Sequence, residues 1–255
     1  MPAQELWRRS RRLSTGMAST GLQLTRWLDT LLFPPRCRLC GAAPGADTGL
    51  CQACLDDLPW LESGCLRCAH PLAGGVDTLL CGACQKRPPA FDAATALLHY
   101  RPPADYLIQR LKFSGELAIG PLLAHLLAGK IAARTTPLPG LLIPVPLHPA
   151  RLRSRGFNQA TELARTLGRR LDVPVDHRLC QRDRRTKPQS LTPLRLRRRN
   201  LRGAFSVTGR LPVDGHVAII DDVLTTGHTA DELARVLRRA GAGYVEVWII
   251  ARSAH

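Results

Sequence analysis

Apolar residues recur at two different spacings in the part of the chain that follows residue 90. A helical spacing predicts helices over residues 105–112, 117–133, 158–171 and about 229–240. Short apolar runs over residues 141–145, 217–220 and 244–250 predict buried strands. Helices and strands that alternate in this way favour an α/β fold with a parallel sheet.

The first 33 residues have a different pattern. Leucines and a tryptophan at helical spacing predict an amphipathic helix over residues 18–33, or a leader segment. Gln23, Arg26 and Asp29 interrupt that stretch, so it resembles neither an export signal nor a membrane span. Other apolar segments are also too short to span a membrane, and we therefore expect a cytoplasmic protein.

The chain is strongly basic, with 36 Lys and Arg against 20 Asp and Glu and a formal net charge of +16. Eight thiolates on two zinc ions would lower this charge to about +12, because each four-cysteine zinc site has a net charge of about −2. Either charge favours attraction to polyanions. An ordinary solvated surface in an arginine-rich protein explains it equally well, so charge alone does not establish nucleic-acid binding.

Eight of the nine cysteines form four Cys-x-x-Cys pairs, which are Cys37/Cys40, Cys51/Cys54, Cys65/Cys68 and Cys81/Cys84. Two such pairs supply the four thiolates of a closed, tetrahedral structural zinc site. The sequence around the first two pairs is repeated around the last two, 28 to 30 residues later. This repeat favours two sequential zinc sites in a small zinc-ribbon module over residues 34–90.

Other uses of the cysteines remain open. Interleaved pairing would also fill two zinc sites. A disulfide framework is disfavoured by the lack of an export signal, and a redox motif would need one pair near a βαβ unit instead of four in a Gly/Pro-rich segment. Cys180 stands alone, and we expect it to be a buried structural thiol.

The segment from Val217 to Thr229 is an apolar strand, two acids, a turn with hydroxyl and glycine residues, and a helix. A helix N-terminus behind such a turn offers backbone N–H groups to a phosphate at the carboxyl end of a strand. Hydroxyls would add donors, glycine would let the backbone approach the anion, and the acids would accept from sugar hydroxyls. The candidate residues are Asp221, Asp222, Thr225, Thr226, Gly227 and Thr229. Simple helix capping would need only one such residue.

This segment resembles the phosphoribosyl-pyrophosphate signature of type I phosphoribosyltransferases. The motifs LLFPPRC from Leu31, LKFSGE from Leu111, IPVPLH from Ile143, RGFNQ from Arg155 and RTKPQSL from Arg185 resemble, in order and spacing, those of the ComF family. The resemblance implies a type I phosphoribosyltransferase-like domain over residues 91–255, behind a double zinc ribbon and the segment 1–33. It also implies that Mg²⁺ bridges pyrophosphate and sugar, and that Pro146, Leu147 and Arg155 belong to the ligand site. His228 departs from the family, which generally has a small residue there.

Ten Lys or Arg and one acid lie between Arg178 and Arg202. Arg185 and Lys187 resemble the mobile catalytic loop that closes over pyrophosphate, where positive charge would stabilise the leaving group. A predicted helix then holds Arg195, Arg197, Arg198, Arg199 and Arg202. These arginines would suit the backbone of single-stranded DNA, although a solvated helix face is the plain alternative.

The ComF resemblance implies handling of incoming single-stranded DNA in natural transformation, with a competence helicase or uptake protein as a possible partner. The alternative is an active salvage-type phosphoribosyltransferase that acts on an unidentified base or nucleophile. A structural zinc adaptor, in which the acids are unused, is the third class. Fold alone does not decide among these functions.

Overall fold

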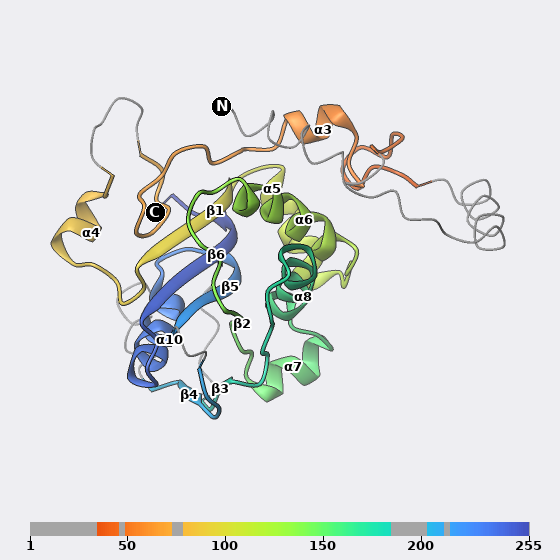
Figure 1. Cartoon of the computed structure of the whole chain (residues 1–255). Coiled ribbons are helices and arrows are strands. Elements are labelled where there is room, and N and C mark those ends of the chain that lie inside the picture. The colour runs from red at the N-terminus through yellow and green to blue at the C-terminus, as the bar shows by residue number, and fades with distance from the viewer. Residues whose placement is uncertain (1–34, 46–48, 73–78, 185–202, 212–214, 255) are drawn as a thin grey trace. The chain divides into compact units, whose positions relative to one another are not determined.

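The computed structural model describes residues 35–45, 49–72, 79–184, 203–211 and 215–254 (Figure 1). The chain divides into two compact units, of which the first ends at Leu58 and the second begins at Pro59. Three predictions lie outside the described residues. They are the helix expected over 18–33, the two catalytic residues Arg185 and Lys187, and the five DNA-binding arginines between 195 and 202.

The first unit contains helix α3, Gln52–Asp56, which begins directly after Cys51 and buries Cys54 and Leu55. In the second unit, β1 (Ala93–His99), β2 (Leu141–Pro144), β5 (His216–Leu224) and β6 (Tyr244–Arg252) form one sheet. The order is β1-β6-β5-β2, and all three strand pairs are parallel. The predicted α/β fold with a parallel sheet is therefore confirmed.

Helices connect these strands, and the apolar spacing predicts four of them, α5 (Ala104–Phe113), α6 (Ile119–Ala132), α8 (Gln159–Leu171) and α10 (His228–Arg239). The short helix α7 (Pro149–Arg155) follows β2, and another short helix, α4 (Gly82–Lys86), precedes β1. Figure 1 shows α5, α6 and α8 gathered on one side of the sheet and α10 on the other. A short antiparallel ladder of β3 (Cys180–Arg182) and β4 (Phe205–Val207) contributes buried Cys180, as expected of this cysteine.

Sequence reasoning did not predict helix α7. It buries none of its residues, so no apolar spacing reveals it. Local chemistry holds it instead: His148 Nδ1 accepts a hydrogen bond from Ala150 N–H at 3.2 Å, and Pro149 fits the first helical turn. Gly156, at φ +83°, ends the helix in the left-handed region.

Strand β5 is longer than the predicted 217–220, which ended before the two acids. Its ladder with β6 continues to the pair Leu224↔Arg252, so Asp221 and Asp222 lie inside the strand. The backbone is held by its partner beyond the point where the apolar run stops, and the apolar run alone underestimates the strand. Because successive strand residues point to opposite faces, the two carboxylates leave β5 on opposite sides.

Within the described ranges, we find no helix that is both long enough and apolar enough to cross a membrane.

Candidate phosphoribosyl and zinc sites

Asp222 lies on the face of β5 that meets helix α5. Its side chain is buried, and Oδ1 forms an ion pair of 2.9 Å with Lys112 Nζ from α5. The other oxygen, Oδ2, is buried with no hydrogen-bond partner among the described residues. A buried carboxylate oxygen in this state can accept from a ligand hydroxyl or bind a cation, since most buried polar atoms in proteins are paired.

Burial raises the pKa of Asp221 to about 7, and the negative charge of Asp222 acts in the same direction. Lys112, the Asp222 N–H and Arg182 oppose this rise in pKa. The Asp222 N–H donates to Asp221 Oδ1 at 2.9 Å. Asp221 therefore keeps its proton to a higher pH than an ordinary carboxyl group unless a cation or a ligand compensates the negative charge around it.

Two arginines interact with these acids, and a third, Arg151, acts on both of these arginines. Burial lowers the pKa of Arg155 and of Arg182, and the charge of Arg151 lowers both further. Asp222 opposes the shift at Arg155, while Asp221 opposes it at Arg182. These arginines repel one another, so the site favours binding of an anion that carries several negative charges. Pyrophosphate is such an anion.

The predicted residues Pro146 and Leu147 follow β2, which pairs with β5 through Pro144↔Ile220. They line a cavity of about 510 Å³ together with His148, Asn158 and Arg182 among others. Asn158 holds this loop, since its Nδ2 donates to Val145 O at 3.0 Å. Predicted Arg155 donates to Gln159 Oε1 at 2.7 Å and does not line this cavity.

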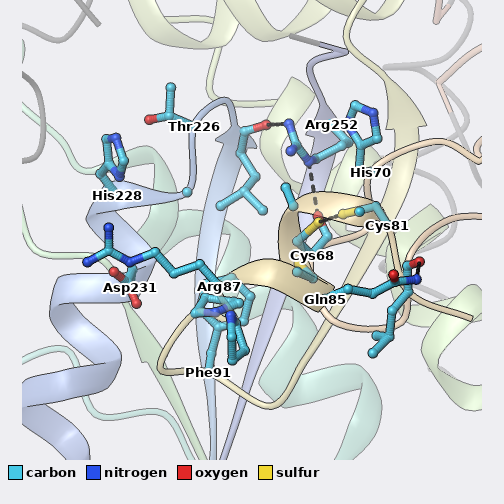
Figure 2. Close-up of a pocket in the computed structure, with 18 of the residues that line it drawn as sticks. Cys68, His70, Cys81, Gln85, Arg87, Phe91, Thr226, His228, Asp231 and Arg252 are labelled. Carbon is cyan, nitrogen blue, oxygen red and sulfur yellow. Dashed lines mark hydrogen bonds between the residues drawn. The ribbon is translucent and has the colours of Figure 1, made fainter. Parts of the chain in front are cut away.

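The predicted residues Thr225, Thr226 and Gly227 form the loop between β5 and α10, with Gly227 at φ +76°. Thr226 Oγ1 is buried and has no hydrogen-bond partner among the described residues. The loop and His228 line a second cavity of about 760 Å³, whose opposite wall comes from the second cysteine group and α4. Figure 2 shows Thr226, His228 and Asp231 on one side and His70, Cys81 and Gln85 on the other. Predicted Thr229 lies in the first turn of α10, half-buried.

Arg252, at the end of β6, joins the two walls of this cavity (Figure 2). Its Nε donates to the carbonyl of Cys68 at 3.0 Å, and Nη1 donates to the carbonyls of Leu224 at 3.0 Å and Thr225 at 2.6 Å. The arginine is buried, so these bonds are shielded from water. One guanidinium therefore fixes the start of the loop 225–227 against a cysteine knuckle, a role that sequence reasoning missed.

The eight paired cysteines form two groups in the order predicted. Cys37, Cys40, Cys51 and Cys54 make the first group, and Cys65, Cys68, Cys81 and Cys84 make the second. Within each group all sulfur atoms lie within 4.8 Å of one another. The sequential grouping is therefore confirmed over the interleaved one. His70, which lies between the knuckles of the second group, lines the larger cavity instead of joining the sulfurs.

The geometry of both groups fits zinc. A tetrahedral zinc with bonds of 2.3 Å places its sulfurs about 3.8 Å apart, and Cys40 and Cys51 Sγ are 3.5 Å apart, Cys68 and Cys81 Sγ 3.6 Å. Burial by itself would raise the pKa of Cys37, but backbone N–H groups of Cys40, Cys51 and Leu39 lower it to about 6. Backbone N–H groups likewise lower the pKa of Cys65 to about 7, against burial. N–H groups aimed at these two sulfurs stabilise the thiolate form that binds metal, whereas burial and the neighbouring thiols raise the pKa of Cys68 to about 11.

Comparisons with known proteins agree with this assignment. Residues 28–85 match the family model of the double zinc ribbon domain. DNA utilization protein YhgH of Salmonella typhi is 37% identical over 229 residues, which cover 88% of this chain and 99% of the relative. Competence protein F of Haemophilus influenzae is also 37% identical, with 87% and 98% covered. Competence protein ComFC of Streptococcus pneumoniae is 25% identical over 62% of this chain and 67% of its own length.

Among solved structures, a purine phosphoribosyltransferase from Pyrococcus horikoshii Ot3 aligns with 63% of this chain and 88% of its own, at a TM-score of 0.31 and 16% identity. That similarity is distant, whereas the sequence relatives span nearly the whole chain. The chain belongs to the ComF family of competence and DNA-utilization proteins, and it carries that family's double zinc ribbon.

Proposed function

We propose that this protein binds phosphoribosyl pyrophosphate at the carboxyl end of β5 and uses that site while it handles single-stranded DNA. The observation that carries the first part is a pair of buried polar atoms without partners among the described residues, Asp222 Oδ2 and Thr226 Oγ1. Both belong to the strand–loop–helix motif, where Asp222 lies in β5 and Thr226 in the loop before α10. A sugar hydroxyl or cation at the first atom and a phosphate at the second would satisfy both.

Each part of the ligand has a matching group in the site. The loop 225–227 and the N-terminus of α10 would hold the 5′-phosphate, and the acids would accept from the ribose hydroxyls. Arg155 and Arg182 would face the pyrophosphate beside the loop that contains Pro146 and Leu147. Mg²⁺, when bound with the ligand, would neutralise charge between the pyrophosphate oxygens and the ribose.

The DNA part of the proposal rests on the family and on charge. The relatives are named for competence and for DNA utilization, and the basic residues 195–202 would supply contacts to a phosphate backbone. Such a protein would act in the cytoplasm, where its thiolates stay reduced, and would meet a competence helicase or uptake protein there.

A transferase reaction is the second candidate. Arg155 and Arg182 lie beside the acid pair, where they would stabilise negative charge on departing pyrophosphate, with Arg185 and Lys187 closing over it. Release of pyrophosphate from the ligand and wild-type protein, in a screen of bases, would support this candidate.

Isothermal titration calorimetry tests the ligand. The zinc-loaded protein should bind phosphoribosyl pyrophosphate with Mg²⁺ more tightly than ribose 5-phosphate, because only the former reaches the arginines. The variant Asp221→Ala/Asp222→Ala should lose Mg²⁺-dependent binding, whereas Asp105→Ala, an acid on α5, should keep it. Equal binding by all three proteins would refute the site.

The DNA contact has its own test. Replacement of Arg195, Arg197 and Arg198 by glutamine should weaken binding of a single strand and lower the slope of log K against log salt by up to about 2, since each phosphate contact contributes about 0.7. Unchanged affinity and slope would assign these arginines to solvation instead.

A further inference from the structure

Helix α5 presents two aromatic rings to solvent. Tyr106 is 51% exposed and Phe113 is 73% exposed, the highest exposure among the large hydrophobic residues that the structure describes. The two rings are seven residues apart, which is two helical turns or about 10.5 Å, so they lie on one face. The opposite face buries Leu107, Ile108 and Leu111 and anchors the helix. Aromatic residues are enriched where proteins contact partners, so two exposed rings on one face mark a candidate contact surface.

A guanidinium covers one side of each ring. Arg110 lies 5.2 Å from the ring centre of Tyr106, and Arg155 lies 5.5 Å from that of Phe113. Both arginines are held by a second contact: Arg110 forms a bidentate ion pair with Glu116 at 2.5 Å, and Arg155 donates to Gln159. Each ring is thus fixed from one side by a cation, while its large exposed area remains available to a flat partner.

The end of this face lies beside the acid pair. Lys112, the residue before Phe113, pairs with Asp222 Oδ1 at 2.9 Å. Arg155, which covers the Phe113 ring, is close enough for the charge of Asp222 to act on it. A molecule stacked on Phe113 would therefore lie next to the ribose end of the phosphoribosyl site.

We propose that single-stranded nucleic acid binds along this face of α5, with one base stacked on Tyr106 and another on Phe113. The inference rests on the proposed function and names where the strand meets the phosphoribosyl site. Aromatic rings interleaved with arginines suit bases linked by phosphates, because the rings stack on base faces and the cations attract the backbone. A duplex hides its base faces, and an aliphatic protein partner would not use the arginines, so an unpaired strand fits best.

Exposure distinguishes Phe113 from Phe205, which is buried in the ladder of β3 and β4 and offers no free ring face to a base. Phe113 lies in the LKFSGE motif at the end of α5, off the spacing of Leu107, Ile108 and Leu111, but sequence alone does not show whether another segment covers its ring. Only its exposure in the fold marks it as a stacking platform.

Fluorescence anisotropy with a labelled oligothymidylate tests the proposal. Phe113→Ala and Tyr106→Ala should each weaken binding about 10-fold, as expected from loss of one base–aromatic stack. Phe113→Trp should restore or strengthen binding. The slope of log K against log salt should stay unchanged, because stacking releases no counterions. Tyr244→Ala is the matched control: this tyrosine is 43% exposed at the start of β6, and its loss should leave binding unchanged.

An abasic strand of the same length identifies the contact as stacking, since wild type and Phe113→Ala should bind it equally. An oligouridylate arm distinguishes DNA from RNA as the source of the strand. Normal melting temperatures establish that each variant is folded. If wild type binds the strand and both alanine variants bind it equally well, the α5 face is wrong while the proposed function stands. If wild type binds no single strand at all, the DNA part of the proposed function fails as well.

Discussion

Replacement of Arg252 by methionine tests whether the second cysteine group supports the phosphate loop. Methionine keeps an apolar stem of similar length and removes the guanidinium. The carbonyls of Cys68, Thr225 and Ser253 then lose their hydrogen bonds to this arginine. The carbonyl of Leu224 loses less, because it also accepts from Ser253 N–H at 3.1 Å.

The size of the effect follows from these contacts. A buried polar group that loses its partner costs about 1–3 kcal/mol, so a conservative sum over these three carbonyls is a loss of about 4 kcal/mol in the free energy of unfolding. For a unit of this size 1 kcal/mol corresponds to about 2–4 °C, so the melting temperature should fall by about 12 °C. Without the hydrogen bonds from Arg252, the loop 225–227 should also bind phosphoribosyl pyrophosphate more weakly.

Arg235→Met is the matched control. Arg235 also lines the larger cavity, but it is an exposed arginine paired with Asp231 at 2.9 Å on the surface of α10. Such a pair contributes less than about 1 kcal/mol. Differential scanning calorimetry of zinc-loaded proteins gives the comparison, with calorimetric titration of the ligand alongside. Equal melting temperatures for the two variants would refute the role assigned to Arg252.

Further predictions concern protonation, zinc and packing. The fold raises the pKa of Asp221 to about 7, so between pH 4 and pH 7 the folded protein holds a proton that the unfolded chain has released, and stability should fall as pH rises through this range. Urea unfolding at pH 5 and pH 8 should show a smaller fall for Asp221→Asn than for wild type, and an identical fall in both proteins would contradict the raised pKa. Cys65→Ser should lower the melting temperature of the unit that begins at Pro59 more than Cys40→Ser does, because Cys40 lies in the other unit. Metal analysis should find about one zinc lost in each variant. Equal melting temperatures of this unit in both variants would show that the second cysteine group does not stabilise it. Gly168→Ala should destabilise the folded protein by about 1–3 kcal/mol, because the new Cβ would lie 2.5 Å from Val175 Cγ2. Gly129→Ala should stabilise it by up to about 1 kcal/mol, because nothing lies within 4 Å of that Cβ and alanine favours the helix. Denaturant midpoints that move in the same direction for both variants would refute this packing argument.

The sequence determined the features whose chemistry is local. A Cys-x-x-Cys knuckle carries its own geometry, so the spacing and repeat around Cys37 and Cys65 were sufficient to predict two four-cysteine groups. The strand–loop–helix motif could also be predicted from sequence, because Gly227 and the threonines lie next to one another in the chain between the strand and the helix. Apolar spacing placed α5, α6, α8 and α10 because each buries one face against the sheet or a neighbouring helix.

The same local reasoning failed where no apolar pattern exists. Helix α7 is held by a cap and by Pro149 without a buried face, and the end of β5 is held by the ladder to β6. Strand β1 also escaped prediction, since its burial depends on pairing with β6, which lies about 150 residues later in the chain. Strand β6 has an apolar run of its own and could be predicted, whereas β1 shows its strand character only through this pairing.

Only the tertiary structure decided which side chains meet. Lys112 reaches Asp222 from a helix more than 100 residues earlier, and Arg252 links Cys68 to Thr225. The exposure of Phe113 is decided in the same way, since a ring at the end of a helix is covered or open to solvent according to the segments that pack around it. The sequence by itself therefore determined the kinds of site, because their ligating groups are close in the chain. Their partners, charge balance and accessible faces were decided by the fold, because those depend on contacts between residues that are distant in sequence.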